Sequence, residues 1–232
     1  FETTAQSNEN PKELEQKISS AKNDSKKIEL LLELSNYYLT KEGEIKSDLD
    51  SALKFNSQAR QLSDKINSKI GKGKSMLLEA KILREKGQVE ISLAKIKQAI
   101  AYFEKNAMNE ELGDGYNALT YHYDNSPENI IIKIGLKTKA LEIFKKAKAN
   151  EKQANLLKEL GELYILKSDP DTAVDLLKQS LAMYQSIKFK KVQDVYNFLA
   201  QAEIQKANYE EALKYGLLAE RLAIQLNDNS KV

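Results

Sequence analysis

The sequence contains no cysteine and only one histidine, His122. The absence of cysteine excludes disulfide bonds, thiol nucleophiles and zinc–thiolate sites. A single histidine excludes a His-pair metal site, and a Ser/His/Asp triad would have to use His122 itself. Since imidazole titrates near neutral pH, His122 is a candidate ligand contact or pH-sensitive group. The plainer interpretation is a partly exposed helix residue between Tyr121 and Tyr123.

Long apolar runs and a strong net charge are also missing. No stretch of about 18 apolar residues occurs, so no segment is predicted to span a bilayer. The net charge at pH 7 is +2, which provides little attraction for nucleic acid or for an anionic membrane. We therefore expect no nucleic-acid partner, no membrane contact within this chain, and no metal or other cofactor.

Carboxylates arranged for catalysis are absent as well. Acidic residues are numerous, but most have a lysine at helical spacing, as Glu210 has Lys214, and such pairs usually mark a solvated face. Acid–base catalysis needs carboxylates on an apolar background, where a pKa can shift, and we find no such pair. We therefore do not expect this chain to be an enzyme, although a kinase core could lie beyond Val232 in a longer parent protein.

The segment Gly71–Ser75 (Gly-Lys-Gly-Lys-Ser) has the ending of a Walker phosphate loop without its beginning. The pattern needs another glycine five positions before Gly73, where the chain has Ser68, and it also needs a preceding β-strand. The local pattern is helical instead. We expect a helix-to-helix turn with solvated lysines.

Proline is scarce, and each of the three prolines follows a residue that can cap a helix. These dipeptides are Asn10-Pro11, Ser126-Pro127 and Asp169-Pro170. Proline suits the first position of a helix because its missing N–H would have no partner there. Each dipeptide therefore predicts the start of a helix.

The first part of the chain predicts three helices. We expect a disordered segment at Phe1–Glu9 and a short helix at Lys12–Ala21. Asp24 is expected to cap the next helix. A charged loop is expected at Lys41–Asp50, before a partner helix at Leu49–Ile66.

The segment Asn155–Tyr184 predicts two packed helices. Its apolar and small residues recur at spacings of three and four on both sides of a turn at Ser168–Pro170. Gly161 in the first helix and Ala173 in the second would let the two helices approach closely. One such pair cannot bury its own apolar face, so it needs stacked neighbours.

Pairs of residues twelve positions apart recur along the chain, and the first pair fits if its loop, Lys41–Asp50, carries five extra residues. The pairs are Ser35 with Ala52, Ala80 with Ser92, Thr120 with Ile132, Gly161 with Ala173, and Ala200 with Ala212. Their second members are 40, 40, 41 and 39 residues apart, although Ile132 is bulky for this position. We expect an N-terminal segment at 1–23 and five units at about 24–68, 69–105, 106–149, 150–188 and 189–228.

This unit resembles a tetratricopeptide repeat (TPR). The family pattern of large, small and aromatic residues is matched at Leu157, Leu160, Gly161, Tyr164, Ala173, Leu177 and Ser180. The period of about 40 is longer than the usual ~34, and a closing proline is missing. The resemblance implies an all-α, right-handed superhelical solenoid of antiparallel helix pairs.

Two helices have unusual apolar patterns. The second helix of the third unit, which carries Ile130, Ile131 and Ile132, is apolar on more than one side, so we expect it to lie deep in the stack. The last helix, Tyr209–Leu226, presents apolar residues without a polar capping helix after it. These residues are Leu213, Leu217, Leu222 and Ile224. We expect the parent chain to continue, with pairing to another chain, including a homodimer, as the alternative.

In tetratricopeptide proteins the first helix of each pair lines a concave groove, and the resemblance implies which positions do so here. Asn and Gln offer a donor and an acceptor to the backbone of an extended peptide, and Tyr121 offers an apolar contact with a polar tip. The alternative is that these residues are polar because they face water. The candidate groove residues are Asn36, Lys81, Arg84, Asn117, Tyr121, Asn155, Lys158, Glu162, Asn197 and Gln201. Leu32 and Leu77 also occupy groove positions, and Asp114, Asp124, Ile165 and Asp194 lie one turn farther out.

Lys158 alone falls on a position of the two-carboxylate clamp of the chaperone-binding subfamily, so that ligand is not expected. The stretch Glu13–Thr40 resembles the start of the extracytoplasmic sensor region of bacterial TPR-containing sensor histidine kinases. This resemblance implies a protein or peptide ligand, a periplasmic location, and two-component signalling relayed through the last helix. The start at Phe1, without Met, agrees with an excised piece of a longer protein.

Two other functions are open. A free cytosolic adaptor or chaperone-like module would have the same repeats in a cytoplasmic protein. A peptide-sensing transcription regulator would need a helix-turn-helix, and no segment outside the repeats remains to supply it.

Overall fold

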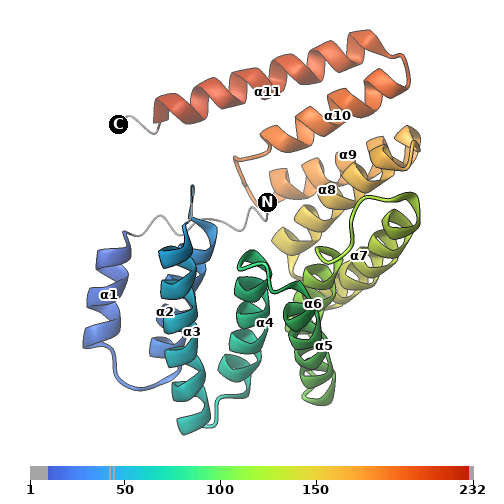
Figure 1. Ribbon diagram of the computed structural model, residues 1–232. Helices are drawn as coiled ribbons and strands as arrows, with labels where there is room; N and C mark the ends of the chain where they lie inside the picture. Colours follow the sequence, from blue (N-terminus) through green and yellow to red (C-terminus); the bar gives the residue numbers. More distant parts are fainter. Residues whose placement is uncertain (1–9, 42, 44, 230–232) are drawn as a thin grey trace. The chain divides into compact units, whose positions relative to one another are not determined.

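The computed structural model describes residues 10–41, 43 and 45–229, with side chains up to Gln225 (Figure 1). The disorder expected for Phe1–Glu9 lies outside these residues. Every regular element among the described residues is an α-helix. The helices are α1 (Pro11–Ser20), α2 (Ser25–Thr40), α3 (Lys46–Lys65), α4 (Lys69–Glu85), α5 (Val89–Lys105), α6 (Asn109–Thr120), α7 (Pro127–Ala147), α8 (Asn150–Leu166), α9 (Pro170–Ser186), α10 (Gln193–Gln205) and α11 (Tyr209–Asn229).

The chain divides into two compact units, residues 1–122 with α1 to α6 and residues 123–232 with α7 to α11. Inside each unit, helices that follow one another in sequence pack together (Figure 1). The first helices of successive pairs also touch, since α2 contacts α4, α4 contacts α6, and α8 contacts α10. This arrangement confirms the expected all-α class of packed helix pairs. The division falls within the unit expected at 106–149, so α6 and α7 belong to different compact units.

The helices end at regularly spaced residues in the left-handed backbone conformation. These residues are Asn67, Gly87, Ala107, Lys148, Ser168, Lys188 and Ala207, and they recur about every 20 residues except between Ala107 and Lys148. Backbone bonds across the turn satisfy the last carbonyl groups, as when the Ser68 N–H donates to the Ser63 carbonyl at 2.8 Å. The turn between α6 and α7, residues 121–126, has no residue in this conformation, which explains the longer gap.

Side-chain caps set most of the expected helix starts. All three prolines occupy first helical positions, and Asp24 accepts hydrogen bonds from the Lys26 and Lys27 N–H groups. Ser126 is the N-cap residue of α7, as expected, but its side chain makes no capping bond. The preceding Asp124 accepts from Asn129 and from the Ser126 N–H instead, and these bonds hold the pKa of Asp124 at about 2.

Helix α3 begins at Lys46, three residues earlier than expected, so the Lys41–Asp50 loop is shorter than predicted. The cause is Asp48, whose carboxylate accepts from the Ile45 N–H at 3.1 Å and pairs with Lys41 at 3.0 Å. The hydrogen bond from Lys41, followed by the one from the Ile45 N–H, lowers the pKa of Asp48. Charged residues that suggested a loop therefore hold the first turn of the helix.

Small residues lie where paired helices approach most closely. Buried Ser35 donates to the Ala52 carbonyl at 2.8 Å, and buried Ser92 donates to the Ala80 carbonyl at 2.6 Å. A Cβ atom on Gly161 would come within 2.6 Å of the Leu177 side chain. These pairs agree with the predicted small-residue contacts.

The third pair, Thr120 with Ile132, is wrong, because Ile132 is 43% exposed. In the preceding repeat, buried Ala99 and Phe103 follow the small residue Ser92. Fully buried Ala140 and Phe144 correspond to them, and the same spacing places the small-residue position of this repeat at 133. Helix α6 ends at Thr120, and a six-residue turn, 121–126, leads to α7. Because one residue rotates a helix by about 100°, the shift leaves Ile131 and Ile132 exposed, while Ile130 stays buried. The expectation that this helix lies deep in the stack is therefore wrong.

Helix α11 exposes three of the four apolar residues noted in the sequence. Leu213, Leu217 and Ile224 are 64%, 43% and 56% exposed, whereas Leu222 packs against the core. The residues of α9 at the positions of Leu217 and Ile224 are Lys178 and Gln185, 39 residues earlier, and both are exposed. Helix α11 is thus apolar where its equivalent in the same unit is polar. Pairing with another chain through this face stays a prediction.

Candidate functional site

A hollow of about 270 Å³ lies in the first unit, on the face formed by the first helices α2, α4 and α6. Leu77 and Leu78 of α4, with Phe103 of α5, form its floor and are 7%, 8% and 0% exposed. The remaining lining residues are Leu32, Glu33 and Asn36 of α2, Lys74 and Lys81 of α4, and Glu111 and Asp114 of α6. The hollow therefore has an apolar floor and a polar rim.

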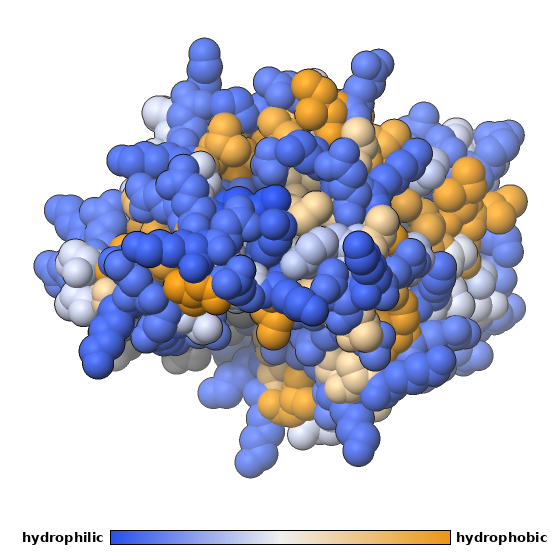
Figure 2. Space-filling model, turned by 90° about the horizontal axis from the view of Figure 1, so that it is seen from below, coloured by the Kyte–Doolittle hydropathy of each residue, from blue (hydrophilic) through white to orange (hydrophobic). Residues whose placement is uncertain are grey.

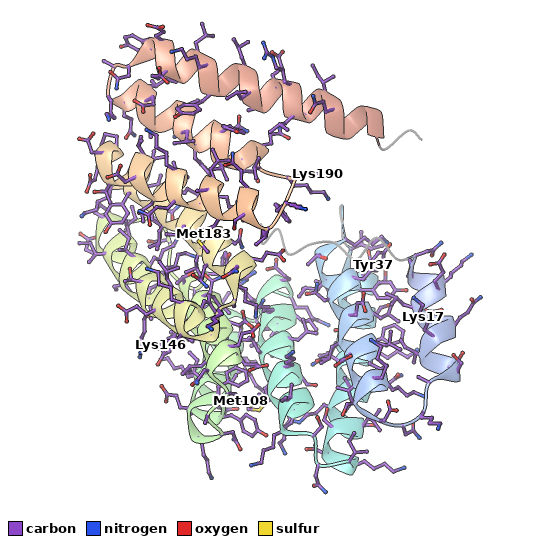
Figure 3. The ribbon with its side chains drawn as sticks, turned by 180° about the vertical axis from the view of Figure 1, so that it is seen from behind. Lys17, Tyr37, Met108, Lys146, Met183 and Lys190 are labelled. Atoms are coloured by element: carbon purple, nitrogen blue, oxygen red, sulfur yellow. The ribbon has the colours of Figure 1, made fainter. Side chains whose placement is uncertain are left out.

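Close packing between helices brings Phe103 under the hollow. A Cβ atom on Gly73 would lie 2.6 Å from the Phe103 ring and 3.3 Å from the methyl group of Met108, which Figure 3 labels. Only glycine allows α4 to approach this ring so closely. The segment Gly71–Ser75 thus lies inside α4 and serves helix packing. The helix-to-helix turn expected there is wrong, as Lys69 already begins the helix.

Most charged side chains of the rim already have interaction partners among the described residues, but one does not. Lys74 pairs with Glu111 at 3.7 Å, and both Lys81 and Asp114 take part in polar interactions. Among the described residues, the half-buried side chains of Glu33 and Asn36 have no hydrogen-bond or ion-pair partner. The rim therefore presents a carboxylate and an amide with unused hydrogen-bonding capacity.

Surface hydrophobicity alone does not single out this site. Figure 2 shows one face of the molecule, on which hydrophilic side chains dominate and hydrophobic ones form small separate patches. Scattered exposed apolar residues are normal for folded proteins. The hollow is distinguished by the buried apolar side chains of its floor.

The structure brings several of the sequence-predicted groove residues together. Asn36 and Lys81, with the neighbouring positions Leu32, Leu77 and Asp114, all line the hollow. They come from three first helices that follow one another in the repeat. That they bind a ligand stays a prediction.

Three further candidates of the first unit lie toward the ends of α4 and α6. Arg84 stacks on the ring of Tyr121 with its guanidinium carbon 4.8 Å from the ring centre, and it also pairs with Glu85 at 2.6 Å. Asn117 is half-buried on α6. Helix α6 ends at Thr120, so the expectation that Tyr121 and His122 lie within a helix is wrong. Asp124 lies in the turn, where its carboxylate accepts hydrogen bonds from the Ser126 N–H and the Asn129 side chain.

His122 has a structural environment that defines its tautomer. Its Nε2 lies 2.9 Å from the Ser92 hydroxyl, which already donates its proton to the Ala80 carbonyl. Nε2 therefore carries the proton and donates to Ser92, while buried Nδ1 has no partner among the described residues. Burial and then the charge of Arg84 lower the pKa of His122. Because its proton is already donated, the Ser92 hydroxyl is not arranged as a nucleophile.

The candidates of the second unit lie on α8 and α10 in more polar surroundings. Lys158 is 9% exposed, whereas Glu162, Asn197 and Gln201 are exposed. Asn155 accepts a hydrogen bond from the Tyr184 hydroxyl at 3.2 Å. Burial is the main reason that the pKa of Tyr184 is raised. Apart from the largely buried Lys158, these positions form a polar helix surface.

A buried ion pair in the second unit escaped the sequence prediction. Lys137 and Glu159 lie 2.7 Å apart with side chains 5% and 12% exposed. Neighbouring Lys133 has a lowered pKa, first because it is desolvated and then because of the charge of Lys137. In the corrected register Lys137 occupies the position that Leu177 has in the following repeat. A charged residue at this otherwise buried apolar position is the sequence signal that could have revealed the ion pair.

No cluster of three or more His, Asp or Glu side chains in the described part of the chain could hold a metal ion. None of its described helices is both long and apolar enough to cross a bilayer.

Known proteins provide a comparison at the level of structure. No protein-family model matches the chain, and no curated protein matches it either. BtubC (BKLC) from P. vanneervenii is similar with a TM-score of 0.70 and 17% identity, over 97% of this chain and 93% of that one.

Two further solved structures are similar. The Rap protein complexed with competence and sporulation factor has a TM-score of 0.61 and 14% identity, over 94% of this chain and 70% of that one. The STAND protein with a tetratricopeptide repeat sensor from Pyrococcus horikoshii has a TM-score of 0.65 and 17% identity, over 91% of this chain and 32% of that one. Together with the helix pairs, these likenesses show that the chain has a TPR-like repeat fold.

Proposed function

We propose that this chain is a protein- or peptide-binding scaffold. The observation that carries the proposal is the hollow between α2, α4 and α6, which collects five of the groove positions inferred from the sequence. Its apolar floor offers burial to a side chain, and its rim offers hydrogen bonds to a peptide backbone. The Rap protein, whose structure contains competence and sporulation factor, supports a binding role by analogy of fold.

A photo-crosslinking experiment tests this proposal. The photoreactive amino acid p-benzoylphenylalanine would replace Asn36 at the hollow or Gln98, an exposed residue of α5, in otherwise identical full-length chains. Illumination in host extract should attach polypeptides at position 36 but not at position 98. Equal crosslinking at both positions, or none at position 36, would contradict the proposal.

We further propose that the chain is the extracytoplasmic sensor region of a bacterial two-component sensor histidine kinase, and thus periplasmic. The resemblance of Glu13–Thr40 to that family supports this context. The repeats of the similar STAND protein are described as a sensor, which supports a sensing role. The reading frame of the gene tests it. An upstream signal segment and a downstream membrane helix with a kinase core are expected, and a frame without them would contradict it.

The alternative function is a free cytosolic adaptor or chaperone-like interaction module. The same hollow and the same fold support this function, since neither depends on a membrane. A gene product that begins with Met near Phe1 and stops at Val232 is the result that would favour it.

A further inference from the structure

The size and floor of the hollow restrict what can occupy it. A volume of about 270 Å³ is below the range of roughly 300–1,000 Å³ that is usual for small-molecule sites. The side chains of Leu77, Leu78 and Phe103, which form the floor, carry no polar atom. A polar group placed there would lose its water without gaining a partner. The hollow is therefore suited to one or two apolar side chains of a longer ligand.

The rim restricts the charge of that ligand. The positive charge of Lys74 is already compensated by Glu111, and Lys81 and Asp114 take part in interactions of their own. The Glu33 carboxylate has no counter-ion among the described residues. An acidic ligand would have to displace the existing partners of the lysines and would be repelled by Glu33. A cationic group would instead supply the counter-ion that the Glu33 carboxylate lacks in the described part of the chain. Electrostatic complementarity of this kind mainly determines which partner binds.

We infer that the hollow binds an extended peptide segment that inserts an apolar side chain between α2 and α4 and places a lysine or arginine against Glu33. The half-buried Asn36 amide, which also lacks a partner among the described residues, donates to or accepts from the peptide backbone. This inference rests on the proposed peptide-binding function and names the chemistry of its ligand.

A peptide-display selection tests the inference with the full chain. A phage library of random ten-residue peptides is panned on the immobilised protein, and selected peptides are synthesised for fluorescence anisotropy. Enriched sequences should combine a Leu, Ile, Phe or Met with a nearby Lys or Arg. Binding should weaken at raised salt, because the Glu33 contact is partly exposed.

Matched variants identify the contacts. Glu33→Gln preserves shape and removes the charge, so it should weaken a selected peptide about tenfold. Leu32→Ala shortens the wall of the hollow and should weaken the same peptide by a similar factor. Glu90→Gln removes an exposed carboxylate from α5 in the same unit and should change nothing. Circular dichroism and thermal unfolding establish that each variant is folded.

The outcomes separate the inference from the proposed function. Enriched peptides that lack a basic residue, or that bind Glu33→Gln as tightly as the unchanged chain, would overturn the inference while leaving peptide binding intact. Failure to enrich any peptide would overturn the peptide-binding function and the inference with it. A reversed preference for acidic peptides in Glu33→Lys would give independent support.

Discussion

The two units carry different side chains at the same repeat position. Three residues before the small residue of the first helix, the first unit has Leu32 on α2 and Leu77 on α4, with Asn117 on α6, whereas the second has only polar residues, Lys158 on α8 and Asn197 on α10. The leucines line a hollow with an apolar floor. The second unit instead has a polar helix surface and a buried ion pair nearby. One repeated backbone therefore supports two kinds of surface, and the side chains at one position decide which kind forms.

The difference also extends to stability. In the first unit, the helices below the hollow are held together by the packing of the Phe103 ring against Gly73, which is a purely apolar contact. In the second unit, Lys137 and Glu159 form an ion pair in the interior. Removing one partner of such a pair leaves the other charge buried and uncompensated, a cost that loss of an apolar contact does not include.

The largest expected effect is therefore in the second unit. Glu159→Leu leaves the buried Lys137 ammonium without this carboxylate, and we expect the free energy of unfolding to fall by about 3 kcal/mol. Urea denaturation followed by circular dichroism measures it. The double variant Lys137→Met with Glu159→Leu should recover most of the loss. A single variant as stable as the unchanged chain would show that the pair contributes little.

The second prediction concerns a substitution that places a polar residue at an apolar position of the hollow. Leu77→Asn gives α4 the residue that α6 and α10 have at this position, and we expect at least a tenfold loss of peptide affinity. The expected cost in stability is about 2 kcal/mol, because the residue is largely buried. Fluorescence anisotropy with a selected peptide measures the affinity. Asn197→Leu is the control and should leave it unchanged.

A smaller effect is expected at the helix contact beside His122. Ser92→Ala removes the donor to the Ala80 carbonyl and the acceptor for His122 Nε2, so the free energy of unfolding should fall by about 1–2 kcal/mol. Ser57→Ala, on the exposed face of α3, is the control. Equal stability of the two variants would rule out a contribution from these buried bonds.

The smallest expected effect is a dependence of the free energy of unfolding on pH that arises from His122, the one histidine of the sequence. Its pKa is lowered by folding, so the unfolded chain binds the proton more readily. Stability should be fully present above the unfolded pKa of about 6.5 and decrease as the pH falls from there through the folded value. Urea titrations at a series of pH values measure this slope. A chain with His122→Gln should lack it, and an identical slope in both chains would exclude His122 as the source.

Local sequence signals determined most of the repeat architecture. Prolines at helix starts, Asp24 as a cap, and small residues at helix contacts act within a few residues or one helix pair, so their effects can be inferred from spacing. The same regularity located Asn36 and Lys81 on the face that contains the hollow. These features depend on helical periodicity and little else.

Only the tertiary structure decided the register of α7, the floor of the hollow and the buried ion pair. The turn 121–126 changes the phase of the following helix, and no local signal distinguishes Ile132 from position 133 at the helix contact. Phe103 reaches the hollow, and Lys137 meets Glu159, through packing between different helices. Such contacts depend on how whole helices are rotated against one another, which a single sequence does not determine because many rotations satisfy the same periodicity.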